Sequence, residues 1–160
     1  MDYELRLEQV TARPLAVARG AAIRANLGPT IISLLDQVWP VLRAQGVRTG
    51  HNVVMYLDDL SHIEAGVEIF GDFSPTADVR TSATPHGLAA TAVHWGDYAE
   101  MAPTYTALRK WCADNGHRLA GPSWEVYGDW HADPQQMRTD IYLLLQRQGD
   151  SLPAASTTNE

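Results

Sequence analysis

The sequence has few of the features that mark several large classes of protein. It contains a single cysteine, Cys112, among 160 residues, so no internal disulfide is possible. No apolar run approaches the roughly 18 residues that a membrane-spanning helix needs, and the N-terminus lacks the pattern of a signal peptide. These absences predict a cytoplasmic protein in a reducing compartment, with no membrane partner.

Basic residues are also scarce. The chain has 12 Lys and Arg against 19 Asp and Glu, a net charge of −7. The longest basic run is the pair Arg109-Lys110, within a helical pattern. Because binding to phosphates needs a positive field, we expect no direct binding of nucleic acid.

The patterns that hold metals and cofactors are missing as well. The six histidines and the lone cysteine form no cluster with the spacing of metal ligands. There is no glycine-rich phosphate loop and no Gly-x-Ser-x-Gly elbow. We therefore expect neither a metal nor a cofactor.

Hydrophobic spacing predicts two similar halves. In the first, an alternating strand at 3–10 and an extended segment at 15–18 precede a helix at 31–44, with strands at 52–57 and around 67–70. Gly46 ends that helix, and Pro40 within it is expected to disturb it. The second half repeats the order with a strand at 88–94, a helix at 99–113 ended by Asn115-Gly116, and strands at 123–127 and 139–145.

A shift of 71 residues places Gly50 on Gly121 and Tyr56 on Tyr127. This order predicts an α+β fold of duplicated strand–helix–strand–strand units. Their antiparallel sheet would carry both helices on one face, with the other face open to solvent or lining a central ligand cleft. We expect one domain at 1–148, with repeats at about 1–75 and 86–148, and a disordered polar tail at 149–160.

The strand that contains Trp124-Glu125-Val126-Tyr127 is the strongest candidate for a site. Aromatic faces attract apolar and cationic molecules, and a carboxylate supplies the opposite charge. By alternation, Glu125 and Tyr127 share one face of the strand, while Trp124 and Val126 share the other. Glu125 is either a solvated strand residue or a pocket acid, whose burial would raise its pKa.

Four segments in order resemble the GyrI-like small-molecule-binding domain, which also serves as the effector-binding domain of multidrug-sensing regulators of the MerR and AraC types. They are His94-Trp-Gly-Asp-Tyr98, the helix with Tyr105 and Trp111, Gly121-Pro-Ser-Trp-Glu-Val-Tyr127 and Thr139-Asp-Ile-Tyr142. The match spans roughly 94–144, and the first half fits in element order only. The resemblance implies repeats around a cleft and makes Glu125 the acid that meets cationic aromatic ligands.

Other aromatic residues are candidates for the walls of the cleft. Tyr56 is either an opposite wall or a core tyrosine, and the same choice between cleft and core holds for Trp95 and Trp124. Tyr98, Tyr127, Tyr142 and Phe70 complete the expected ligand-binding set. His94 fits a structural role better than that of a base, and Trp39 and Trp111 fit packing against the sheet.

Three functions follow from these patterns. The first is a binding protein for amphipathic, aromatic or cationic small molecules, for sensing or sequestration; without a helix-turn-helix before the first strand, we expect it to act alone. The second is a hydrolase that opens strained electrophilic rings, as the resemblance to a hydrolytic subset of the family implies, with Glu125 and Tyr56 catalytic. The third is a gyrase-inhibitor-like module that binds a protein partner.

Overall fold

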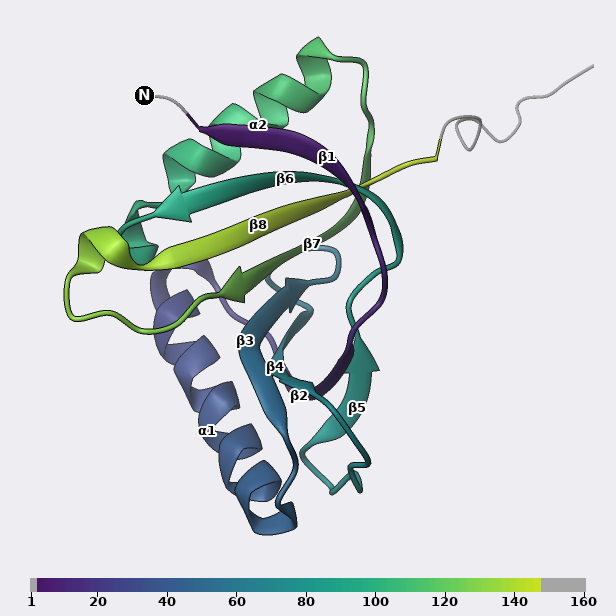
Figure 1. Cartoon of the computed structure of the whole chain (residues 1–160), viewed down its shortest axis with the longest axis vertical. Helices are drawn as coiled ribbons and strands as arrows, with labels where there is room; N and C mark the ends of the chain where they lie inside the picture. The colour runs from purple at the N-terminus through teal and green to yellow at the C-terminus, as the bar shows by residue number, and fades with distance from the viewer. Residues whose placement is uncertain (1–2, 148–160) are drawn as a thin grey trace, which may run out of the picture.

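All the strands among residues 3–147 form one antiparallel sheet. The structure is a computed structural model that describes residues 3–147. The strand order is β1-β6-β8-β7-β3-β4-β2-β5 (Figure 1). The strands and helices in chain order are β1 (Glu4–Val10), β2 (Pro14–Gly20), α1 (Leu27–Gln45), β3 (Thr49–Tyr56), β4 (Ile63–Ile69), β5 (Arg80–Ala83), β6 (Gly87–Trp95), α2 (Ala102–Asp114), β7 (Leu119–Tyr127) and β8 (Arg138–Leu145).

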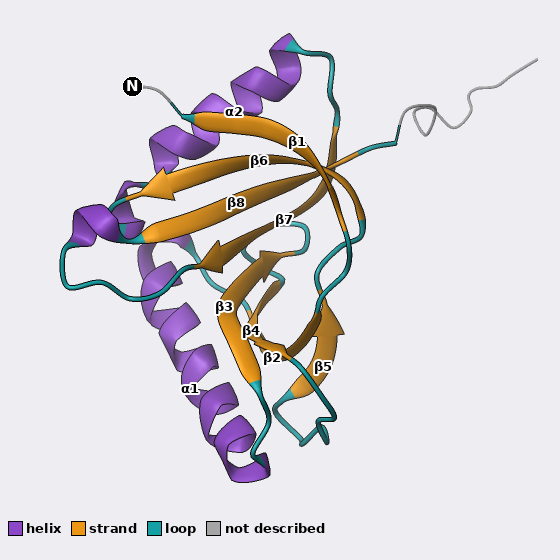
Figure 2. Ribbon diagram, in the orientation of Figure 1, coloured by secondary structure: helices purple, strands orange, loops and turns teal. Residues whose placement is uncertain are grey.

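The sheet consists of two halves with the same internal order. One half is β2-α1-β3-β4 and the other is β6-α2-β7-β8, and they join where β3 pairs with β7. The two remaining strands extend the outer edges, β1 beside β6 and β5 beside β2. Each half carries its own helix, as Figure 2 shows. The predicted α+β fold with duplicated units is thus confirmed.

Helix α1 forms because apolar side chains recur along one side of it. Leu34, Val38 and Leu42 are its buried residues, spaced four apart so that they face the sheet. The helix ends where Gly46 adopts a left-handed conformation, with φ of 64°. Pro40 lies inside the helix, which the structure nevertheless keeps as one element from Leu27 to Gln45.

Three apolar clusters hold the sheet and helices together. The first lies between α1 and the strands β2, β3 and β4, and the second lies between α2 and the strands β6 and β8. A third cluster, on the opposite face, buries Leu15, Val17, Val53, Met55, Ala89 and Trp124. The centre of the sheet is therefore buried on both faces, so the first of the two alternatives for the face away from the helices, that it is open to solvent, is wrong there.

Strand register aligns one row of residues across the helix-facing side of the sheet. The row is apolar except at its middle, where Glu125 is paired with Val54 on β3 and with Ile141 on β8. Its members are Ala18, Ala65, Val54, Glu125, Ile141, Ala92 and Leu5. The fold thus places a single carboxylate in an otherwise apolar row.

Several predicted elements differ from the observed ones. Strand β5 was not expected, because Arg80-Thr-Ser-Ala83 has no apolar alternation and is a strand only through its pairing with β2. The second helix begins at Ala102 and not at Ala99, because residues 98–100 form a 3₁₀ turn capped by Asp97. The expected tail at 149–160 lies outside the described residues, and the repeat boundaries stay a prediction.

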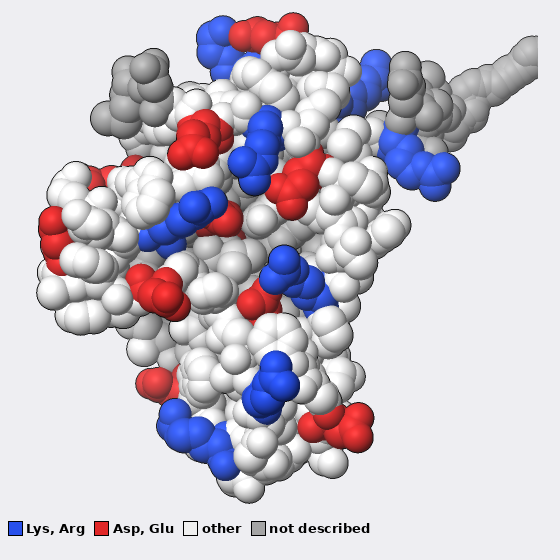
Figure 3. Space-filling model, viewed as in Figure 1, with Lys and Arg blue, Asp and Glu red and all other residues white. Residues whose placement is uncertain are grey.

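Charges are mixed on the surface that Figure 3 shows. Acidic and basic side chains alternate over this face, without a continuous surface of one sign. Within residues 3–147, no helix is long and apolar enough to cross a membrane.

Gly66 provides a test of the packing between β2 and β4. A Cβ atom at Gly66 would lie 1.9 Å from the backbone oxygen of Ala16, so the strands must separate to admit one. We expect Gly66→Ala to lower the free energy of unfolding by about 3 kcal/mol or more. Urea denaturation of the variant and the wild type measures this difference in the free energy of unfolding.

Gly28 is the matched control, since it lies in the first turn of α1 with nothing within 4 Å of an added Cβ. Gly28→Ala should leave stability unchanged or raise it by up to about 1 kcal/mol. Equal effects of the two substitutions would contradict the packing described for β4.

Candidate functional site

The site is built around a buried carboxylate at the junction of the two halves. Glu125 lies on β7, opposite Val54 of β3, and only 3% of it is exposed. The shift of 71 residues that relates Tyr56 to Tyr127 also relates Val54 to Glu125. The acid therefore lies on the pseudo-two-fold axis, where both halves can reach it.

Three tyrosine hydroxyls converge on this carboxylate. Tyr127 donates to Oε1 over 2.6 Å, and Tyr56 donates to the same oxygen over 3.4 Å. Tyr105, from α2, donates to Oε2. Because β3, β7 and α2 each supply one hydroxyl, the cluster joins the two halves of the domain.

Burial dominates the electrostatics of the cluster. Loss of solvent raises the pKa of Glu125 above its usual value, although the three hydroxyls and the nearby His94 act in the opposite direction. Burial and the adjacent carboxylate also raise the pKa of each of Tyr56, Tyr105 and Tyr127, so these hydroxyls remain protonated donors. Within the described part of the chain, no Lys, Arg or His nitrogen lies within ion-pair distance of Glu125.

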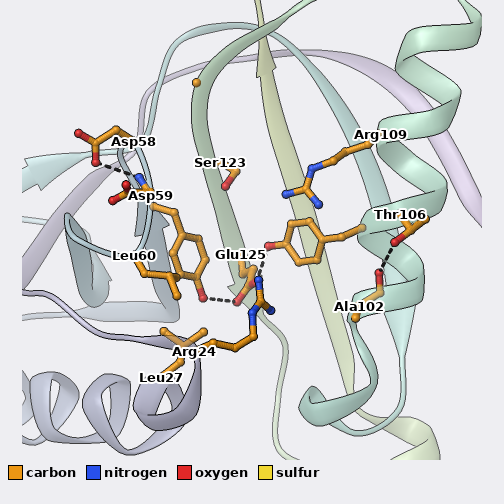
Figure 4. Close-up of a pocket in the computed structure, with 13 residues that line it drawn as sticks. Arg24, Leu27, Asp58, Asp59, Leu60, Ala102, Thr106, Arg109, Ser123 and Glu125 are labelled. Atoms are coloured by element: carbon orange, nitrogen blue, oxygen red, sulfur yellow. Dashed lines mark hydrogen bonds between the residues drawn. The ribbon is translucent and has the colours of Figure 1, made fainter.

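A cavity of about 500 Å³ opens onto Glu125. Tyr56 from β3 and Tyr105 from α2 line it, and their hydroxyls contact different oxygens of the carboxylate, which Figure 4 shows on β7. The start of α1 and the turn after β3 form one wall, and α2 forms the other. The lining residues are Arg24, Leu27, Tyr56, Asp58, Asp59, Leu60, Ala102, Tyr105, Thr106, Arg109, Gly121, Ser123 and Glu125.

The profile of the GyrI-like small molecule binding domain matches residues 58–146, more than half of the chain. The chain belongs to this family. The family assignment covers all of the second half, including β7 and its acid, and confirms the resemblance read from the four motifs.

Solved structures share the fold. The C-terminal domain of EcmrR has a TM-score of 0.75 at 20% identity, over 92% of this chain and 100% of that one. SAV2435, solved with bound tetraphenylphosphonium, has a TM-score of 0.56 at 12% sequence identity, and the match covers 92% of this chain and 95% of that one. A hydrolase from Listeria innocua has a TM-score of 0.59 at 12% sequence identity, and the match covers 89% of this chain and 92% of that one. A search of the curated proteins found no match.

Within the GyrI-like domain, the expected site residues fall into separate groups. Glu125 and Tyr56 both line the cavity. Tyr127 hydrogen-bonds Glu125 but is not among the lining side chains, and its ring lies 5.1 Å from the ring of Tyr98. Tyr127 therefore supports the acid from beside the cavity, and Tyr98 packs against Tyr127.

Trp124 and Tyr142 lie on the opposite face of the sheet, as the alternation along β7 predicted for Trp124. Their rings are stacked, with centroids 5.0 Å apart and planes 5° from parallel. Both line a second cavity of about 490 Å³, which Glu8, Arg13, His51 and Asp140 also border. They cannot contact a ligand held at Glu125, because the sheet lies between.

Trp95 and Phe70 line neither of the two cavities. Each ring is about half exposed and is covered by a guanidinium group, from Arg138 over Trp95 and from Arg48 over Phe70.

His94 has the structural role that its motif suggested. The imidazole is buried, its Nε2 donates to the backbone oxygen of Asp97 over 2.8 Å, and its Nδ1 lies 3.2 Å from the hydroxyl of Thr104. It joins β6 to the start of α2, and this fixes the helix that carries Tyr105.

Of the 13 residues that line the cavity, only Glu125 and Tyr56 were expected site residues, and three of those missed matter most for its chemistry. Tyr105 was assigned to the apolar face of its helix, although its place in the family motif was a signal for a site. Arg24 and Arg109 had no local signal, because they meet only when α1 and α2 are packed on the same face. Across residues 3–147, no group of three or more His, Cys, Asp or Glu side chains is placed to hold a metal ion.

The raised pKa of Glu125 predicts a specific pH dependence of stability. Between the ordinary value of 4.5 and the raised pKa, the folded state binds more protons than the unfolded state. The free energy of unfolding of the GyrI-like domain should therefore fall as pH rises through this window, by at most about 1.4 kcal/mol per pH unit.

Glu125→Gln removes the titrating group, so its stability should change less between pH 8 and pH 5. Urea denaturation at several pH values measures the difference. Asp36→Asn removes one negative charge at an exposed site on α1. Its free energy of unfolding should change with pH as that of the wild type does. Parallel profiles for wild type and Glu125→Gln would contradict the assignment.

Proposed function

We propose that the cavity binds amphipathic aromatic molecules that present a cation or a hydrogen-bond donor to Glu125, in the sensing or sequestration of such compounds. The observation that carries this proposal is the buried carboxylate, which is held by three hydroxyls and has no basic partner in the described residues. Its desolvation is only partly offset, since the pKa stays raised. A ligand cation would supply the missing charge.

The cavity also fits this class of ligand in size and shape. Its volume lies within the range of roughly 300–1,000 Å³ that is usual for small-molecule sites. Tyr56 and Tyr105 line the cavity together with the acid, and an aromatic cation can stack on the faces of such rings. The structural neighbour SAV2435, solved with tetraphenylphosphonium, carries a lipophilic cation on the same fold.

Calorimetric titration with a planar cationic dye such as rhodamine 123 tests the proposal. Glu125→Gln should weaken binding at least about tenfold, because the ligand loses its counter-charge. Wild-type affinity should rise with pH through the raised pKa, since the ionised carboxylate binds the cation better.

Asp36→Asn is the control, because it removes one negative charge outside the cavity. It should leave affinity unchanged. Equal affinity of wild type and Glu125→Gln would remove Glu125 from the site.

A hydrolase is the second candidate, favoured by the long 3.4 Å contact between Tyr56 and Glu125 inside the cavity. In this reaction Glu125 takes a proton from water as the water oxygen bonds to an electrophilic ring carbon. The ring C–C bond breaks, and its electron pair moves onto a conjugated carbonyl oxygen, which Tyr56 protonates. Proton return from Glu125 to Tyr56 then completes the cycle.

Mass spectrometry of a cyclopropane-bearing alkylator incubated with the protein tests this reaction. The expected product is the substrate plus one water, formed at a rate that falls at least about a hundredfold in Glu125→Gln and in Tyr56→Phe. Formation at the buffer rate would exclude the reaction.

A further inference from the structure

The cavity contains two guanidinium groups as well as a carboxylate. Arg24, just before α1, and Arg109, on α2, border it from opposite walls. Both side chains are exposed, and Figure 4 shows both extending toward the middle of the cavity. A simple site for lipophilic cations would not need them, because they repel a cation that approaches Glu125.

Neither arginine is neutralised by a carboxylate within the described residues. Arg6, Arg13, Arg19 and Arg138 each form an ion pair with an acid. No such pair includes Arg24 or Arg109, and Arg109 instead lies over the ring of Tyr105, 5.2 Å from its centroid.

The two other acids of the cavity, Asp58 and Asp59, have hydrogen-bond partners within their own turn and form no ion pair with either arginine. Both oxygens of Asp58 lie near His62 Nδ1, at 3.1 and 3.0 Å, and one also accepts from the backbone N–H of Asp59. Asp59 accepts from the backbone and the hydroxyl of Ser61. In Figure 4 these carboxylates lie at the edge of the cavity, on the side of the turn. The donors of Arg24 and Arg109 therefore remain available to a ligand.

We infer that the ligand is zwitterionic or carries an acidic group: one end places a cation or donor at Glu125, and an oxyanion at the other end binds Arg24 and Arg109. The inference rests on the proposed function and narrows its ligand class. Guanidinium groups bind carboxylates and phosphates through paired, charge-assisted hydrogen bonds. Two arginines on opposite walls would hold such a group from both sides.

Rhodamine 110 and its methyl ester, rhodamine 123, differ only in a free carboxylate. We expect the free acid to bind at least about tenfold more tightly to the wild-type protein, because it alone can pair with the arginines. In the Arg24→Gln/Arg109→Gln double variant this preference should disappear, with the ester bound as well as before or better. Fluorescence anisotropy gives both affinities, and circular dichroism checks that the variant is folded.

Arg43→Gln is the control, since Arg43 is an exposed arginine in the last turn of α1, outside the cavity. It should preserve the preference for the free acid. Equal or weaker binding of the free acid by wild type, with loss of both dyes in Glu125→Gln, would overturn this inference and leave the proposed function intact. If neither dye binds, both proposals fail.

Discussion

The buried carboxylate of Glu125 is the constraint on which the rest of the domain depends. Burying an ionised carboxylate in an apolar row of the sheet costs several kcal/mol in lost hydration. The hydrogen bonds from three tyrosine hydroxyls offset part of that cost. Those hydroxyls come from β3, β7 and α2, so the acid is stabilised only when the strand junction and the second helix are in place. The same hydrogen bonds thus couple the two halves of the domain. They leave the carboxylate without a basic partner among the described residues.

The pseudo-two-fold arrangement explains why a cavity forms there. Each helix covers its own half of the sheet, and the two apolar clusters beneath α1 and α2 do not merge. The gap between them lies over the β3–β7 pair, where Val54 and Glu125 are equivalent positions that face each other. One half supplies an apolar residue and the other an acid, so the symmetric frame carries an asymmetric site.

Much of the fold could be predicted from the sequence, and less of the site. Periodicity and Gly46 located α1, and alternation along β7 separated Glu125 from Trp124 correctly. Alternation could not separate Tyr127, which supports the acid, from Tyr56, which lines the cavity, because both lie on the helix-facing side. Exposed rings such as Phe70 carry the same local signal as rings in a site, and only their exposure in the folded structure and their absence from the cavity lining distinguish them.

The sequence by itself determined the order of elements, the faces of the strands and the choice of Glu125, because these depend on local spacing and on residue type. Only the tertiary structure decided which side chains meet. Tyr105, Arg24 and Arg109 reach the acid's cavity from distant segments once both helices pack on one face of the sheet. It also decided the electrostatics, since the raised pKa of Glu125 arises from burial, which no sequence pattern specifies.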